Sequence, residues 1–138
     1  MADLLSVRKR AIHIVGGRLT RSLADYFFAH MQVIRDRVTL VASNSNTWPH
    51  YVLNMQSGDV LVIFDIRRYE RDILRLAEMA KSKEVTLVLF TDQWGPPLAR
   101  HAAHTFRSRI EAPPAWHSSD VTLFILAAMT TAVLTLSW

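Results

Sequence analysis

Short apolar segments of strand length limit the possible folds of this chain more than any other feature. Five segments have this form: residues 11–15, 37–42, 60–64, 85–90 and 105–110. The segments at 60–64 and 85–90 are continuously apolar, whereas the last one alternates polar and apolar residues. A continuous pattern is typical of a strand buried on both faces, as in a parallel sheet covered by helices. The sequence therefore predicts such a sheet.

The residues between these segments follow the period of a helix. Apolar side chains form a wide face over residues 19–34 and a second face over residues 73–80. Residues 48–55 suffice only for a short helix, and Pro96-Pro97 suits the start of another because proline lacks the N–H that the first turn leaves unpaired. Strand and helix alternate along the chain, so we expect an α/β fold with a five-stranded parallel sheet flanked by helices.

The composition narrows the classes of function. The chain has 138 residues, half of them hydrophobic, which suits one domain with a buried core. It contains no cysteine, so disulfides, thiolate metal sites and a cysteine nucleophile are excluded. The net charge of +4 is modest and no basic cluster stands out, which disfavours direct binding to nucleic acid. The N-terminus lacks the order of a signal peptide, so we expect a cytoplasmic protein.

The C-terminal residues 121–138 carry no charge and just reach the length of a membrane-spanning helix. Four threonines and Ser137 interrupt the segment, and no basic residue follows its far end. Residues 118–120, Ser-Ser-Asp, are good caps for the start of a soluble helix. We therefore predict a helix that covers the sheet or packs against another subunit, and no contact with a membrane.

Two loops are candidates for chemistry, because ligands of open α/β sheets bind at the carboxyl ends of the strands where the strand order reverses. The first loop contains Gly16, Gly17, Arg18 and Thr20. The glycines permit a tight turn, and Arg18 with the hydroxyl of Thr20 suits a phosphate or a carboxylate. The alternative is a plain strand-to-helix turn capped by the threonine. The loop is not a dinucleotide or P-loop motif, since the third glycine and the lysine are missing.

The second loop follows the third strand segment and is dense in charge. It contains Asp65, Arg67, Arg68, Tyr69, Glu70, Arg71 and Asp72. Arg67 and Arg68 are suited to an anion, with Tyr69 packing on a sugar or closing the pocket. The structural alternative pairs Arg68 with Asp72 on a helix surface, for only about 0.3–0.5 kcal/mol, and uses Asp65 as a helix cap. The residues alone leave both interpretations open.

The order of the elements and these two loops resemble the sugar isomerase (SIS) domain, most closely the C-terminal SIS domain of RpiR-type transcriptional regulators. Residues 16–24 are similar to the family's Gly-x-Gly-x-Ser-x-x-x-Ala pattern, with Arg18 for the second glycine and Thr20 for the serine. Residues 58–63 are similar to the approach to its Ser-x-Ser-Gly-x-Thr-x-Glu phosphate loop, and residues 91–99 to its Thr-Asp…Ser-Pro-Leu-Ala segment. The resemblance implies a three-layer, flavodoxin-like fold.

The second loop departs from the family's pattern. The family's serines, glycine and threonine fall on Asp65, Arg67, Arg68 and Glu70. A carboxylate repels a phosphate that a hydroxyl group would bind, while the arginines attract an anion in a different geometry. The resemblance therefore implies a changed anionic ligand, or none.

The resemblance also implies partners and further site residues. SIS domains pair as dimers, and His117 and Ser118 are expected to line a site near the C-terminal helix. RpiR-type regulators carry a helix-turn-helix domain ahead of the SIS domain. We expect residues 1–138 to be a single SIS domain without it, so that DNA would be contacted only through a domain that this chain lacks.

Three functions fit these observations. The leading one is the effector-binding and dimerisation domain of an RpiR-type regulator that senses a small anionic carbohydrate derivative, a sugar phosphate or sugar acid, and is not an enzyme. The second is an aldose–ketose isomerase of the SIS type with Asp65 or Glu70 as base, although the nearby arginines weaken either carboxylate in that role. The third is a dimerisation module without a ligand.

The histidines are weaker candidates. His101 and His104 are three residues apart on a segment expected to be helical, which suits two metal ligands, but no third ligand follows nearby. We therefore expect surface histidines, no metal site and no cofactor. His13, in the first strand segment, is expected to be a core histidine with its hydrogen bonds satisfied.

Overall fold

The computed structural model describes residues 10–17, 21–42, 44–65, 71–92 and 97–108. Within them, five strands form one sheet in the order β2-β1-β3-β4-β5. The strands are β1 (Ile12–Gly16), β2 (Val38–Leu40), β3 (Val60–Asp65), β4 (Thr86–Asp92) and β5 (His104–Ser108). Each neighbouring pair is parallel. The predicted five-stranded parallel sheet is confirmed.

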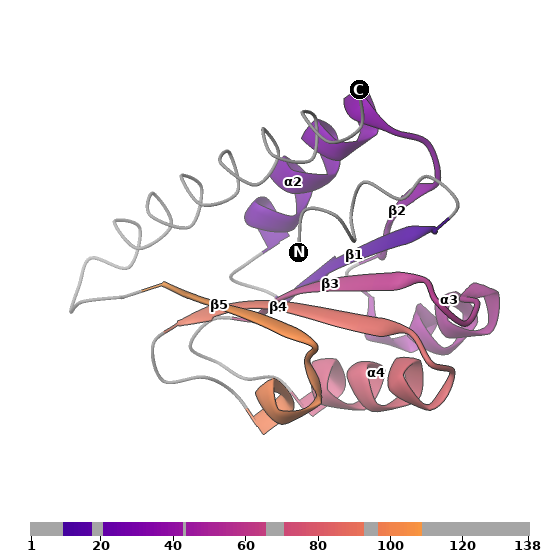
Figure 1. Cartoon of the computed structure of the whole chain (residues 1–138), viewed down its shortest axis with the longest axis vertical. Helices are drawn as coiled ribbons and strands as arrows, with labels where there is room; N and C mark the ends of the chain where they lie inside the picture. Colours follow the sequence, from indigo (N-terminus) through magenta and orange to yellow (C-terminus); the bar gives the residue numbers. More distant parts are fainter. Residues whose placement is uncertain (1–9, 18–20, 43, 66–70, 93–96, 109–138) are drawn as a thin grey trace.

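Helices cover both faces of this sheet. The helix α2 (Arg21–Ile34) lies on one face, and α3 (Trp48–Asn54) and α4 (Arg71–Ser82) lie on the other (Figure 1). Two short 3₁₀ helices, η1 (Ser45–Thr47) and η2 (Pro97–His101), precede α3 and β5. The described residues therefore form the three layers that the SIS resemblance implied.

Each central strand contributes side chains to two cores. In β3, Val60, Val62 and Phe64 pack with α2, whereas Leu61 and Ile63 pack with α3 and α4. All positions of β3 are buried, and in β4 all positions after Thr86 are buried. The prediction that these two continuous segments are buried on both faces is confirmed.

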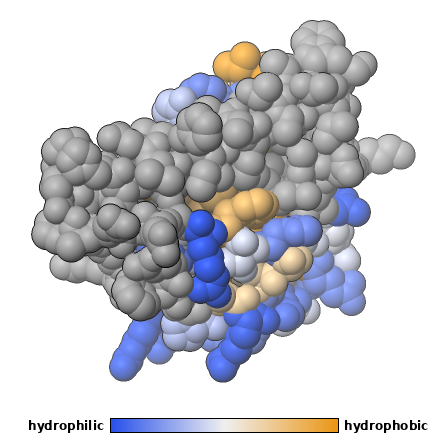
Figure 2. All heavy atoms as spheres, turned by 60° about the vertical axis from the view of Figure 1, so that its left-hand side comes forward, coloured by the Kyte–Doolittle hydropathy of each residue, from blue (hydrophilic) through white to orange (hydrophobic). Residues whose placement is uncertain are grey.

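Few large hydrophobic side chains are exposed among the described residues. On the face drawn in Figure 2, hydrophilic side chains border a smaller hydrophobic area. Among the described residues, the large hydrophobic side chains that are exposed are Tyr26, Val33 and Leu53. These lie on the outer sides of α2 and α3, while the rest of the apolar faces point into the two cores.

Four phenylalanines join the carboxyl halves of the central strands to α2. Phe64 and Phe90 stack with ring centroids 4.9 Å apart, and Phe90 stacks on Phe106 at 5.2 Å. Phe27 of α2 meets Phe64 and Phe90 edge-on, at 5.8 and 6.1 Å. Aromatic pairs in these arrangements add stability beyond the area they bury. They hold the end of β3, from which the second candidate loop emerges, against β4 and α2.

A buried hydrogen-bond network around Asp59 lies at the amino ends of β1 and β3, opposite the ends from which the candidate loops emerge. Asp59 accepts hydrogen bonds from the backbone N–H groups of Ala11 (3.3 Å) and Gln56 (2.9 Å), and one of its oxygens lies 3.1 Å from Nε2 of His13. Burial raises the pKa of the Asp59 carboxyl, but the hydrogen bonds from Gln56, His13 and Ala11 together bring that pKa below its ordinary value. Gly58, at φ +89°, makes the left-handed turn that leads into this residue.

The expected core histidine is confirmed in its burial, but its hydrogen bonding is only half satisfied. His13 is 6% exposed and its Nε2 meets Asp59. Its Nδ1 has no hydrogen-bond partner among the described residues. The expectation that both ring nitrogens are satisfied is therefore wrong for Nδ1.

The segment from Pro97 to Ser108 corrects one prediction. Pro97 does start a helix, but it is the short η2, which ends at His101. The backbone N–H of Ala103 then donates to the carbonyl of Leu87 in β4, and His104 is the first residue of β5. His101 and His104 therefore do not share a helix face. Within the described residues, no group of three His, Cys, Asp or Glu side chains is placed to hold a metal ion.

Candidate functional site

The strand order reverses between β1 and β3. After β1, the chain forms β2 on one side of it and then returns to form β3, β4 and β5 on the other side. Gly16 lies opposite Phe64, and the N–H of Gly17 donates to the Phe64 carbonyl at 3.4 Å. The two strands that precede the candidate loops are therefore neighbours, and ligands of open α/β sheets typically bind beside the carboxyl ends of two such strands.

The structure describes three of the predicted site residues: Gly16, Gly17 and Asp65. Gly16 is the last residue of β1, Gly17 follows it, and Asp65 is the last residue of β3, so the fold brings these residues to one edge. The remaining predicted site residues lie outside the described residues: Arg18, Thr20, Arg67, Arg68, Tyr69, Glu70, His117 and Ser118. The C-terminal helix expected over residues 121–138 also lies outside them.

Asp65 is a buried carboxylate at this edge. It is 3% exposed and lies opposite Thr91 of β4, whose hydroxyl donates to the Asp65 carbonyl at 2.7 Å. This bond and the β3–β4 ladder fix the backbone from which the second loop begins. A carboxylate accepts hydrogen bonds only, so at a ligand site it suits hydroxyl groups and not a phosphate.

Arg21 helps to fix the carboxyl-end edge of the sheet. The sequence around it gives no obvious sign of this role. It is the first residue of α2, and its Nη1 donates to the carbonyl of Val41, just after β2, at 2.8 Å. Its Nε pairs with Asp25 of the same helix at 3.0 Å. These contacts fix the start of α2 against the end of β2. The only sequence signal is the four-residue spacing of Arg21 and Asp25, which is common on helix surfaces.

The comparison of the whole sequence with known protein families agrees with the fold described above. It matches the family model of the SIS domain over residues 4–133, and the chain belongs to the SIS domain family. None of the curated proteins matches it. No helix in the described parts of the chain has both the length and the apolar character needed to cross a membrane.

Solved structures share this fold at low sequence identity. The sugar isomerase domain of an RpiR transcription factor from Sphaerobacter thermophilus has a TM-score of 0.84 at 18% identity, over 99% of this chain and 76% of that one. The NanR protein of Vibrio vulnificus, complexed with ManNAc-6P, has a TM-score of 0.80 at 13% identity, over 97% of this chain and 53% of that one. The expected resemblance to RpiR-type SIS domains is confirmed.

The same fold also occurs in an enzyme. A phosphoheptose isomerase from Francisella tularensis has a TM-score of 0.73 at 11% identity, over 96% of this chain and 81% of that one. The chain thus shares its fold with both regulators and isomerases, and it spans about half the length of the NanR protein.

Proposed function

We propose that this SIS domain is the effector-binding and dimerisation domain of an RpiR-type transcriptional regulator, which binds a small anionic carbohydrate derivative without turnover. The observation that carries the proposal is the adjacent carboxyl ends of β1 and β3, where Gly17 donates to Phe64. Loops containing Arg18 and Arg67 follow these two strands. In the proposed site, the arginines bind the phosphate or carboxylate, and the Asp65 carboxylate accepts hydrogen bonds from sugar hydroxyl groups.

The similarity in fold to an RpiR transcription factor and to a NanR protein complexed with ManNAc-6P supports this role. In a regulator, the effector shifts a dimer between two arrangements with different spacing of the DNA-binding domains. Allosteric couplings of this kind are typically worth about 1–3 kcal/mol. We expect the chain alone to form a dimer in light scattering and to bind no DNA sequence specifically in a mobility-shift assay.

A thermal-unfolding panel tests ligand binding. Sugar phosphates and sugar acids are each compared with the neutral sugar of the same stereochemistry, and with inorganic phosphate. At a hundred times its dissociation constant, a ligand adds about 2.7 kcal/mol to the free energy of unfolding. We expect at least one anionic sugar to raise the melting temperature while its neutral counterpart does not. A panel with no response contradicts the proposal and favours a dimerisation module without a ligand.

Two variants locate the site. Arg18→Ala and Arg67→Ala should each abolish the response to the anionic sugar, because each removes a charged donor from the proposed site. Arg100→Ala is the matched control, since Arg100 lies exposed on η2 and, within the described residues, its side chain makes a hydrogen bond only to His101, at 3.4 Å. A response that survives both site variants contradicts the placement.

Isomerisation of a sugar phosphate is the second candidate function. The similarity in fold to a phosphoheptose isomerase and the buried carboxylate at the end of β3 favour it. The reaction requires a base within hydrogen-bonding reach of the substrate carbon. Turnover of a sugar phosphate that disappears in Asp65→Asn, with the melting temperature retained, would support the isomerase and contradict the regulator.

A further inference from the structure

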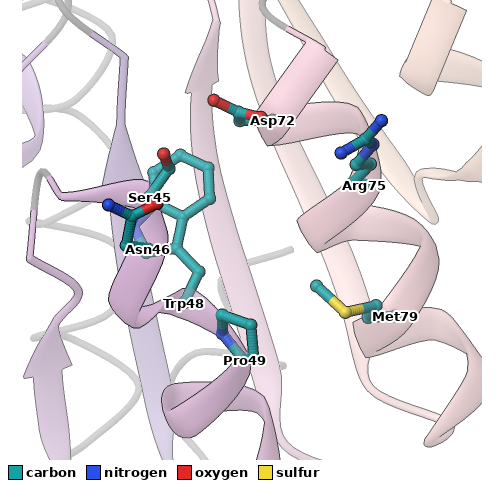
Figure 3. A pocket seen from close by; sticks show the side chains of 7 residues that line it. All are labelled: Ser45, Asn46, Trp48, Pro49, Asp72, Arg75 and Met79. Carbon is teal, nitrogen blue, oxygen red and sulfur yellow. The ribbon is translucent and has the colours of Figure 1, made fainter.

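On the face of the sheet opposite α2, a groove lies between α4 and the segment formed by η1 and the start of α3. Its volume is about 270 Å³, and its lining includes Ser45, Asn46, Trp48, Asp72, Arg75 and Met79. In Figure 3, Asp72 projects from α4 toward Ser45 and Asn46, while Met79 projects toward the start of α3. The indole of Trp48 is buried, and its N–H donates to the Ala42 carbonyl at 2.7 Å, which fixes the orientation of the ring. Asp72 closes the second candidate loop of the sequence, whereas the other lining residues lie outside both candidate loops.

Two opposite charges face this groove without pairing. Asp72 and Arg75 are three residues apart on α4, a spacing that places their Cβ atoms about 5–6 Å apart on the same side of a helix. Both are exposed, and within the described part of the chain neither forms an ion pair or a side-chain hydrogen bond. Arg21 and Asp25 on α2 do pair, at 3.0 Å. The carboxylate and the guanidinium in the groove are therefore both available to a ligand.

This arrangement matches the chemistry of a free amino acid. Such a ligand carries an ammonium and a carboxylate on one carbon atom, and Asp72 suits the first group while the planar fork of Arg75 suits the second. Ser45 and Asn46 supply further hydrogen-bonding groups, and Met79, with the small part of Trp48 that is exposed, supplies an apolar surface for a side chain. A phosphate dianion fits poorly because Asp72 repels it.

We propose that the groove between α3 and α4 is a second small-molecule site, which binds a zwitterionic amino acid with an apolar side chain. Titration calorimetry with L-leucine and L-methionine tests it, beside two analogues of leucine. One analogue, 4-methylpentanoate, lacks the ammonium, and the other, 3-methylbutylamine, lacks the carboxylate. We expect saturable binding of an amino acid, and binding weaker by about tenfold or more for each analogue, since each loses one charged contact.

Variants on α4 provide the matched controls. Asp72→Asn and Arg75→Gln should each weaken amino-acid binding by about tenfold or more. Glu78→Gln and Lys81→Gln remove exposed charges of the same signs from the same helix but outside the groove, and they should bind as the wild type does. All four positions are exposed, so the variants are expected to fold.

Three outcomes would overturn the proposal. The first is no saturable binding of either amino acid at millimolar concentration. The second is binding that Asp72→Asn and Arg75→Gln leave unchanged, and the third is equal binding of an analogue that lacks one of the two charges. The response to anionic sugars should not change in Arg75→Gln, because Arg75 lies outside both candidate loops. Failure of this site is thus distinguishable from failure of the sheet-edge site.

Discussion

Asp59 illustrates how one buried carboxylate fixes the start of two neighbouring strands. Its oxygens receive the N–H of Ala11, which precedes β1, the N–H of Gln56, which follows α3, and the ring of His13 within β1. A buried carboxylate without such donors would destabilise the fold. With them, the pKa of Asp59 lies below its ordinary value, so the charged form contributes to the stability of the folded chain.

Asp59→Asn should lower the free energy of unfolding at pH 7 by about 1.5–3 kcal/mol, the range for hydrogen bonds to a charged group. Because the folded-state pKa of Asp59 lies below the unfolded value of about 3.9, its contribution is present above that pH. It is lost as the pH falls through the folded-state pKa. Urea unfolding of both proteins between about pH 7 and pH 3 should show the difference narrowing at the acid end. A difference that stays constant would contradict this role.

The partner of His13 shows what the sequence could not reveal at the scale of residues. Burial of His13 is predictable, because it stands in an apolar segment of strand length. Its bond to Asp59 joins residues 46 positions apart and depends on β1 and β3 being neighbours in register. The same limit applies to Arg21, whose contact with the Val41 carbonyl depends on the position of β2.

At the scale of elements, the geometry at the C-terminal end of α4 could not be predicted from the sequence. The N–H of Glu84 donates to the Lys81 carbonyl, and the N–H of Val85 donates to the Ala80 carbonyl. This is the hydrogen-bond pattern of a Schellman motif. The motif places Glu84 at φ 63°, in the left-handed region that favours glycine. Because no glycine stands there, the sequence gives no signal of how this helix ends.

Glu84→Gly should therefore raise the free energy of unfolding by about 1 kcal/mol, since it relieves the left-handed conformation of a residue with a Cβ atom. The control is Glu84→Ala, which keeps the conformation and loses only the 2.9 Å hydrogen bond from Ser57. Chemical denaturation should show a gain for glycine and none for alanine. Equal effects of the two substitutions would mean that the backbone at this position is not strained.

Strands and long helices were predictable from the sequence where burial imposes a clear period. The continuous segments at 60–64 and 85–90 became β3 and β4 with small changes at their ends, and the apolar face over 19–34 became α2. The strand β2 is shorter than the segment at 37–42 that predicts it, and within the described residues it pairs with β1 on one side only. The helix at Pro97 ended early because the following residues join the sheet beside β4.

At the scale of the whole molecule, the sheet separates two sets of loops. The carboxyl ends of β1 and β3 lie at one edge, where the strand order reverses (Figure 1). Gly58 and Asp59 precede β3 and therefore lie at the opposite edge. The candidate loops were predictable from strand ends and charge, because a parallel sheet brings the carboxyl ends of its strands to one side. How their side chains meet depends on loop conformations that no periodic pattern encodes.

Because the two sets of loops are separated, hydrogen exchange along the chain tests the proposal that an anionic sugar binds at the carboxyl ends of β1 and β3. An anionic sugar bound beside the carboxyl ends of β1 and β3 should slow amide hydrogen exchange at residues 15–17 and 63–65, because local opening must then also release the ligand. The amides of Gln56 and Asp59, at the opposite edge, should exchange as they do in the free protein. Exchange measured by mass spectrometry with and without the sugar distinguishes the sites, since an amino acid in the α3–α4 groove should instead protect residues 45–49 and 72–79. Protection spread evenly over both edges would mean that the sugar stabilises the fold without binding at the carboxyl ends of β1 and β3.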